Sequence, residues 1–210
     1  VEGPGRIRYF KHDEENRFLG YLYSERYNDV ADMVAFANDC GGRKSEIKRI
    51  NTERDVDGRM LTIITTKAKA AFPRTIELTD RALKILKRRP NNPFTMISDE
   101  ELRKAWNFGK IKMGLQGDKQ FVFHITRHTF ASRLVQSGIG IQIVQDLLGH
   151  KTIKMTLRYA HLAPHNKTEA RMALERSDKS GVKLAKVVGI WIKVYYTTML
   201  FVITMDLKST

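Results

Sequence analysis

Apolar residues recur at helical spacing along most of the chain. Between residues 13 and 37, for example, Phe18, Leu19 and Leu22 follow the three- and four-residue period of an amphipathic helix, and the period repeats from Val30. Similar patterns predict further helices over residues 43–50, 79–89, 98–113, 125–137, 141–148 and 152–159.

Residues at the ends of these segments support the predicted boundaries. Thr79 and Ser98 stand where helix N-caps are expected, and Glu101 completes a capping box with Ser98. Gly138 and Gly149 stand where two helices should end.

Two short segments have a different pattern. Residues 59–67 and 73–78 are rich in threonine and β-branched residues, which predicts two strands around a turn near residues 67–72. The expected fold class is therefore α+β, mainly α-helical with a small antiparallel sheet.

Composition narrows the functional class. The chain has 210 residues, which indicates one or at most two domains, and a net charge of +14. That charge favours nucleic acid as partner, with a membrane surface second. One cysteine, Cys40, excludes a disulfide within the chain and fits a reducing cytoplasm. The chain begins at Val1 without a visible signal peptide, so we interpret it as a fragment or a processed chain.

The segment HITRHTF, residues 124–130, concentrates candidate chemistry. His124 and Arg127 are three residues apart and share a helix face, where an arginine can bind phosphate oxygens and a histidine can move a proton. His124 and His128 have the spacing of a zinc pair. Zinc is disfavoured because the glutamate of the H-E-x-x-H motif is absent and Arg127 lies between the histidines.

Further residues follow in an order that is specific. The segments RHTFAS, LLGH and RYAHLAP, together with an upstream arginine and a lysine in the predicted turn, resemble the catalytic domain of the tyrosine recombinases, the phage integrase family. The resemblance covers about residues 6–176. It implies the fold of that catalytic domain and six catalytic residues, namely Arg43, Lys67, His124, Arg127, His150 and Tyr159.

Three of these residues would bind the scissile phosphate. By the resemblance, Arg43 and Arg127 hold it and His150 donates a further hydrogen bond. Fixed cations suit this task because the phosphate gains negative charge in the transition state. Such a cationic set needs no metal ion, so we expect neither a metal nor any other cofactor.

The other three residues would move protons and form the covalent link. By the resemblance, Tyr159 attacks the phosphorus and forms a 3′-phosphotyrosyl bond, while His124 assists proton transfer at this nucleophile. Lys67 protonates the departing 5′ oxygen. Lys69 competes for this role, but Lys67 directly follows the strand threonine, as in the family.

Several neighbouring residues have no assigned chemical step. We expect Glu46 to orient the upstream arginine, and His128 and His161 to give structural support. Cys40 stands where the family usually has threonine, and Thr126 where an apolar residue is common, so we expect slightly altered packing and retained function.

The end of the chain differs from the rest. We expect the catalytic domain to span residues 1–178 and a tail to span residues 179–210. Within the tail, the alternation over residues 184–204 favours a strand or docking segment. A tail that did not evolve with this fold stays possible, as does a membrane helix, which Lys193 disfavours.

The resemblance implies a site-specific DNA recombinase that integrates or excises a phage or mobile element. Its partners would be double-stranded attachment sites, three further copies in a homo-tetramer, and accessory DNA-bending proteins, in the bacterial cytoplasm. The alternative is a DNA-binding protein that keeps the fold without catalysis. A type IB topoisomerase would share the chemistry, but it needs neither a specific sequence nor synapsis.

Overall fold

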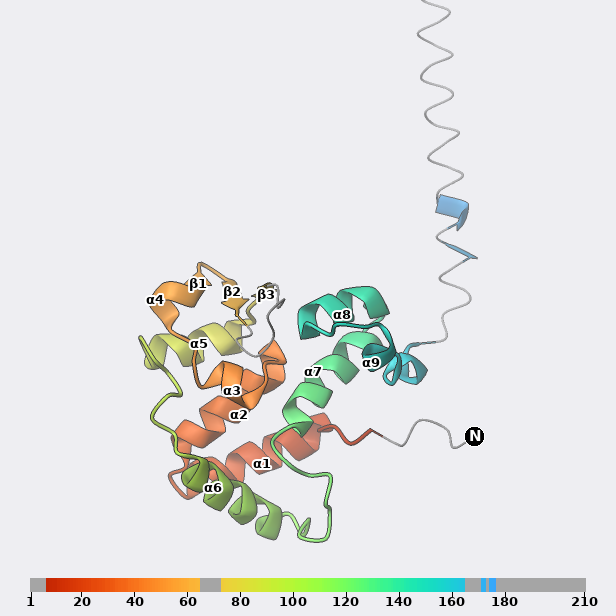
Figure 1. The fold of residues 1–210 in the computed structure, drawn as a ribbon. Helices are drawn as coiled ribbons and strands as arrows, with labels where there is room; N and C mark the ends of the chain where they lie inside the picture. The colour runs from red at the N-terminus through yellow and green to blue at the C-terminus, as the bar shows by residue number, and fades with distance from the viewer. Residues whose placement is uncertain (1–6, 65–72, 165–170, 173, 177–210) are drawn as a thin grey trace, which may run out of the picture. The chain divides into compact units, whose positions relative to one another are not determined.

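The computed structural model describes residues 7–64, 73–164, 171–172 and 174–176. The chain divides into two units, 1–164 and 165–210, and the account below concerns the first. In the described part of that unit, the elements in chain order are α1 His12–Ser24, α2 Asn28–Cys40, α3 Lys44–Ile47, α4 Thr52–Asp55, β1 Val56–Asp57, β2 Met60–Ile63, β3 Arg74–Glu77, α5 Asp80–Arg88, α6 Asp99–Lys112, α7 Ile125–Gln136, α8 Ile141–Leu148, α9 Lys154–Leu157 and the 3-10 helix η1 Ala160–Leu162 (Figure 1).

Helix α2 forms the centre of the fold because it is apolar on nearly all sides. Val30, Met33, Val34 and Phe36 are fully buried. The helix packs against α1, α5 and α7, so each of its faces has a different partner. The helical pattern over residues 13–37 thus becomes two helices, which separate where Arg26 adopts a left-handed backbone with φ of 62°.

The sheet is small and antiparallel, in the order β1-β2-β3. Leu61 pairs with Ile76, and both are buried on the inner face. Strand β3 also packs against α8, which brings the sheet beside the last part of the unit (Figure 1). The expected fold class, mainly α with one small antiparallel sheet, is confirmed.

The predicted boundaries hold at several helices. The side chains of Thr79 and Ser98 each accept a hydrogen bond from a backbone N–H three residues on. Gly138 and Gly149 adopt positive φ at the ends of α7 and α8. The helix expected over residues 152–159 is shorter than predicted: α9 ends at Leu157 and η1 follows.

Three expectations fall on residues that the structure does not describe. Lys67 and its competitor Lys69 lie in the segment 65–72, and the hydrophobic stretch 184–204 and the domain boundary at residue 178 lie in the segment 177–210. Within the described residues, no helix combines the length and the apolar character of a membrane span.

An aromatic cluster holds α1 against α6. The rings of Phe18 and Trp106 lie 4.8 Å apart, and Phe10 and Phe121 pack on them. Helix α6 comes this close because it has Gly109 at the contact. A methyl group there would lie 2.3 Å from the Phe18 ring.

Replacing Gly20 on α1 and Gly109 on α6 with alanine should have opposite effects on stability. Gly109→Ala should lower the free energy of unfolding by about 1–3 kcal/mol, because the added carbon overlaps the Phe18 ring. Gly20→Ala should raise it by about 0.5–1 kcal/mol, because nothing lies within 4 Å of the new carbon and alanine favours the helix. Urea unfolding of both variants measures the difference, and a destabilised Gly20→Ala would contradict this account.

Candidate active site

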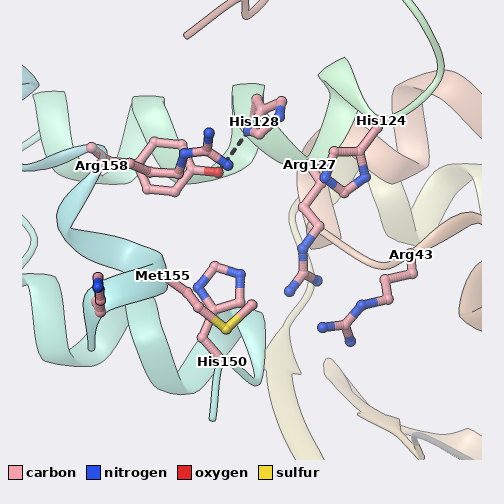
Figure 2. A pocket seen from close by; sticks show the side chains of 9 residues that line it. Arg43, His124, Arg127, His128, His150, Met155 and Arg158 are labelled. Atoms are coloured by element: carbon pink, nitrogen blue, oxygen red, sulfur yellow. Dashed lines mark hydrogen bonds between the residues drawn. The ribbon is translucent and has the colours of Figure 1, made fainter. Parts of the chain in front are cut away.

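A pocket of about 290 Å³ opens where α3, α7 and α9 come together (Figure 2). Five of the six residues predicted for the site line it: Arg43, His124, Arg127, His150 and Tyr159. The remaining described lining residues are His128, Lys154, Met155 and Arg158.

Arg127 is the most deeply held cation of the pocket, with 3% of its surface exposed. Its guanidinium donates to the carbonyl of Gly41, at 2.8 Å, and to the carbonyl of Leu148. Gly41 directly follows α2 and Leu148 is the last residue of α8, and a cation is stabilised at the C-terminal end of a helix. Two of the five guanidinium donors are used in this way, so the same side chain can still donate to an anion.

Glu46 connects the second arginine of the pocket to the sheet. Its carboxylate accepts hydrogen bonds from the Arg43 side chain at 2.8 Å and backbone N–H at 2.8 Å, and from Arg74 on β3 at 2.6 Å. Arg74 in turn donates to the carbonyl of Leu147 at 2.9 Å. The expectation that Glu46 orients Arg43 is confirmed, and Arg74 extends the connection to the end of α8.

The charge state of Glu46 follows from this geometry. Burial opposes ionisation, but the hydrogen bonds from Arg74 and from Arg43 outweigh it and lower the pKa of Glu46 to about 2. The carboxylate is therefore ionised at neutral pH and compensates part of the charge of the arginines around it.

The hydroxyl of Tyr159 contacts a histidine at the pocket. Its oxygen lies 2.7 Å from Nδ1 of His128, one turn along α7 from His124 (Figure 2). Burial raises the pKa of Tyr159, although Arg158 and Arg127 oppose this shift. The tyrosine is therefore protonated at neutral pH, and it needs a proton acceptor in order to act as a nucleophile.

The other two imidazoles lie among the cations. Nδ1 of His150 is 2.9 Å from Oγ1 of the buried Thr156, which fixes the ring beside the pocket. Burial and the charges of Arg127, Arg43, Arg74 and Arg158 lower the pKa of His150 to about 4. The ring of His124 meets the ring of His128 edge to face, with 4.8 Å between centroids. Burial and the nearby arginines also lower the pKa of His124.

The arrangement suits a phosphate ester. Arg43, Arg127, Lys154 and Arg158 supply positive charge, and the neutral imidazoles can donate or accept protons. Among the described residues, no group of three or more histidine, cysteine or acidic side chains could hold a metal ion.

Comparisons with known proteins agree with this geometry. The sequence profile of the phage integrase family matches residues 8–166. The chain belongs to the phage integrase family. It is 29% identical over 185 residues to the integrase of Salmonella phage P22, covering 78% of this chain and 46% of that protein. It is 28% identical over 148 residues to the integrase of Haemophilus phage HP1, covering 70% and 42%. The chain thus spans less than half the length of these relatives.

A solved structure matches more completely. The catalytic domain of bacteriophage HP1 integrase shares 28% sequence identity with this chain and superimposes with a TM-score of 0.65, covering 80% of this chain and 95% of that domain. An integrase of the transposon Tn1549, solved in complex with circular intermediate DNA, shares 20% identity with a TM-score of 0.60 and shows the same fold.

The integrase signature in the sequence found most of the pocket but not all of its contacts. His128, expected to give only structural support, contacts the tyrosine hydroxyl. Arg74 carried no functional expectation, because an arginine in a short strand gives no sign of a partner such as Leu147, 73 residues away. Arg158 also lines the pocket, and the only feature of the sequence that could have indicated this is its position directly before Tyr159.

The low pKa of Glu46 makes stability depend on pH. Because the pKa falls from an ordinary 4.5 to about 2 on folding, the ionised carboxylate contributes about 3 kcal/mol above pH 4.5, and this contribution is lost as pH falls towards 2. Glu46→Gln should therefore lower the free energy of unfolding by about 3 kcal/mol at pH 7. The difference from wild type should shrink below pH 4.5.

Urea unfolding at a series of pH values measures this difference. Glu77→Gln is the matched control, because that carboxylate lies on β3 with 71% of its side chain exposed. A deficit of Glu46→Gln that stays constant from pH 7 to pH 3 would contradict the proposed charge state.

Proposed function

We propose that this chain is the catalytic domain of a site-specific DNA recombinase, which cleaves and rejoins DNA through a 3′-phosphotyrosyl intermediate. The observation that carries the proposal is the position of the Tyr159 hydroxyl at a pocket lined by Arg43, Arg127 and His150. The superposition of this chain on the catalytic domain of HP1 integrase, which covers 95% of that domain, supports the same function.

The pocket accounts for the binding step. Arg127 is fixed by two helix ends and Arg43 by Glu46, so both guanidinium groups are in place before DNA arrives. Donors that need no rearrangement stabilise the charge of a pentacoordinate phosphate most effectively. His150, held by Thr156, adds a hydrogen bond to the same phosphate.

The chemical step exchanges one phosphodiester for another. The Tyr159 oxygen attacks phosphorus as its proton leaves, assisted by His124 as the family resemblance implies. The bond to the 5′ oxygen breaks, and Lys67 protonates that oxygen. Because the phosphotyrosyl bond keeps the energy of the broken bond, a 5′ hydroxyl can reverse the step without ATP or another cofactor.

The partners follow from the same proposal. A net charge of +14 favours a polyanion such as DNA, and binding should weaken as salt rises. The family resemblance implies that this DNA is a double-stranded attachment site. Recombination joins two duplexes with two cleavage sites each, so four copies of the protein would act together. Accessory proteins that bend DNA would bring the sites together. The setting would be the bacterial cytoplasm at the nucleoid.

Tyr159→Phe tests the nucleophile. The variant loses one oxygen and keeps the buried ring, so folding and DNA binding should persist. On a nicked suicide substrate that traps the 3′ intermediate, the wild-type chain should form a DNA-linked band in denaturing gels, whereas the variant should form none. Mass spectrometry of the linked peptide should place the nucleotide on Tyr159.

Two outcomes oppose the proposal in different ways. A nucleotide found on Tyr195, Tyr196 or another residue would overturn the assignment of the nucleophile. A wild-type chain that binds attachment-site DNA without any adduct would favour the non-catalytic DNA-binding protein instead.

A substrate with a different leaving group can show whether Lys67 or Lys69 is the general acid. Lys67→Ala should lose most of its cleavage rate on ordinary DNA, because the 5′ oxygen then lacks a proton donor. A 5′-bridging phosphorothiolate leaves without a proton, so that substrate should restore the rate. Lys69→Ala is the matched control and should cleave both substrates at similar rates. The assignment fails if Lys69→Ala, and not Lys67→Ala, is rescued by sulfur.

A further inference from the structure

The histidine that contacts the Tyr159 hydroxyl is His128, not His124. Nδ1 of His128 lies 2.7 Å from the hydroxyl oxygen, a hydrogen bond between residues 31 positions apart. In Figure 2 the bond runs from α7 across the upper side of the pocket, while His124 lies on the side of Arg127. The family resemblance gave His128 no chemical step, so this contact remains to be explained.

We propose that His128 is the catalytic residue that accepts the proton of Tyr159 as the tyrosine attacks DNA. The inference rests on the proposed function, since it concerns the activation of the same nucleophile. A general base must lie within hydrogen-bond reach of the proton it takes, about 2.6–3.2 Å between heavy atoms, and the contact of His128 meets this condition.

The surroundings of His128 keep its imidazole neutral and able to accept a proton. The groups that influence it are His124 directly before α7, Arg127 on α7, His150 after α8, and Arg158 beside the tyrosine. Burial and these neighbours lower the pKa of His128 to about 4, so the ring is neutral at pH 7. A neutral imidazole with its proton on Nε2 has Nδ1 available as an acceptor for the tyrosine O–H.

The same cations make the proton transfer depend on DNA. Without DNA, an imidazolium at His128 would lie among Arg127 and Arg158, which disfavours it. A phosphate in the pocket places negative charge beside these arginines and reduces the repulsion. Tyr159 should therefore remain a protonated phenol until the scissile phosphate is bound, which protects the free protein from unwanted reaction.

The step balances in atoms and charge. The Tyr159 O–H bond breaks and its proton moves to Nδ1 of His128, which becomes an imidazolium. The tyrosine oxygen forms a bond to phosphorus, the bond from phosphorus to the 5′ oxygen breaks, and that oxygen takes a separate proton from the general acid. In rejoining, the imidazolium returns its proton to the tyrosine oxygen. His124, whose ring meets that of His128 edge to face, assists this proton transfer by orienting the base.

His128→Asn separates a base from a structural contact. An asparagine oxygen can occupy the place of Nδ1 and accept the tyrosine hydrogen bond, but it cannot take the proton. We expect adduct formation on the suicide substrate at pH 7 to slow by roughly 100-fold or more. His12→Asn is the matched control, because His12 is exposed on α1 and does not line the pocket. It should keep the wild-type rate.

The pH profile gives a readout that a purely structural role would not change. Between pH 6.5 and 8.5 the wild-type rate should vary little, because His128 is already neutral. The His128→Asn rate should rise about tenfold per pH unit, because hydroxide must then remove the tyrosine proton. The 5′-bridging phosphorothiolate should not restore His128→Asn, since the defect concerns the nucleophile and not the leaving group.

The outcomes distinguish this inference from the function on which it rests. If wild type forms the adduct and His128→Asn matches its rate and pH profile, His128 is not the base, and the recombinase function stands. A uniform loss of rate with an unchanged profile, or rescue by sulfur, also overturns the inference. If wild type forms no adduct, the proposed function itself fails. If Tyr159→Phe still forms an adduct, the nucleophile is another residue, and this inference fails together with that assignment.

Discussion

The pocket depends on the hydrogen bonds between the buried carboxylate of Glu46 and the arginines around it. Three arginines, Arg43, Arg74 and Arg127, lie close enough for their charges to act on one another, and two of them bond directly to Glu46. Without a buried negative charge, their mutual repulsion and loss of hydration would oppose folding. The arginines in turn stabilise the ionised form of Glu46 and so lower its pKa.

The end of α8 shows how the same arginines also organise the backbone. Arg74 bonds to the carbonyl of Leu147 and Arg127 to that of Leu148, so two guanidinium groups satisfy carbonyls that a helix terminus leaves without partners. Gly149 follows with a φ of 62°, and a side-chain carbon there would lie 3.1 Å from Arg74. The chain can therefore turn sharply at this point and place His150 beside the pocket.

Charge in the pocket is divided between permanent cations and neutral proton carriers. The arginines keep their charge at any physiological pH, whereas burial and the arginines together hold His128 and His150 neutral. Binding of a phosphate and transfer of a proton can therefore be assigned to different side chains. Tyr159 contacts a neutral imidazole and also lies near the arginines. Burial raises the pKa of its hydroxyl, while the charges of Arg158 and Arg127 oppose that shift.

The sequence alone determined the fold class, the cap residues Thr79 and Ser98, and five of the residues that line the pocket, because local periodicity and an ordered motif carry this information. It did not reveal the break at Arg26 or the short elements α4 and β1, since two to four residues give no period. Only the tertiary structure decided which histidine meets Tyr159. His124 and His128 are one helical turn apart and both line the pocket, so the choice depends on how α7 packs against the segment that carries the tyrosine.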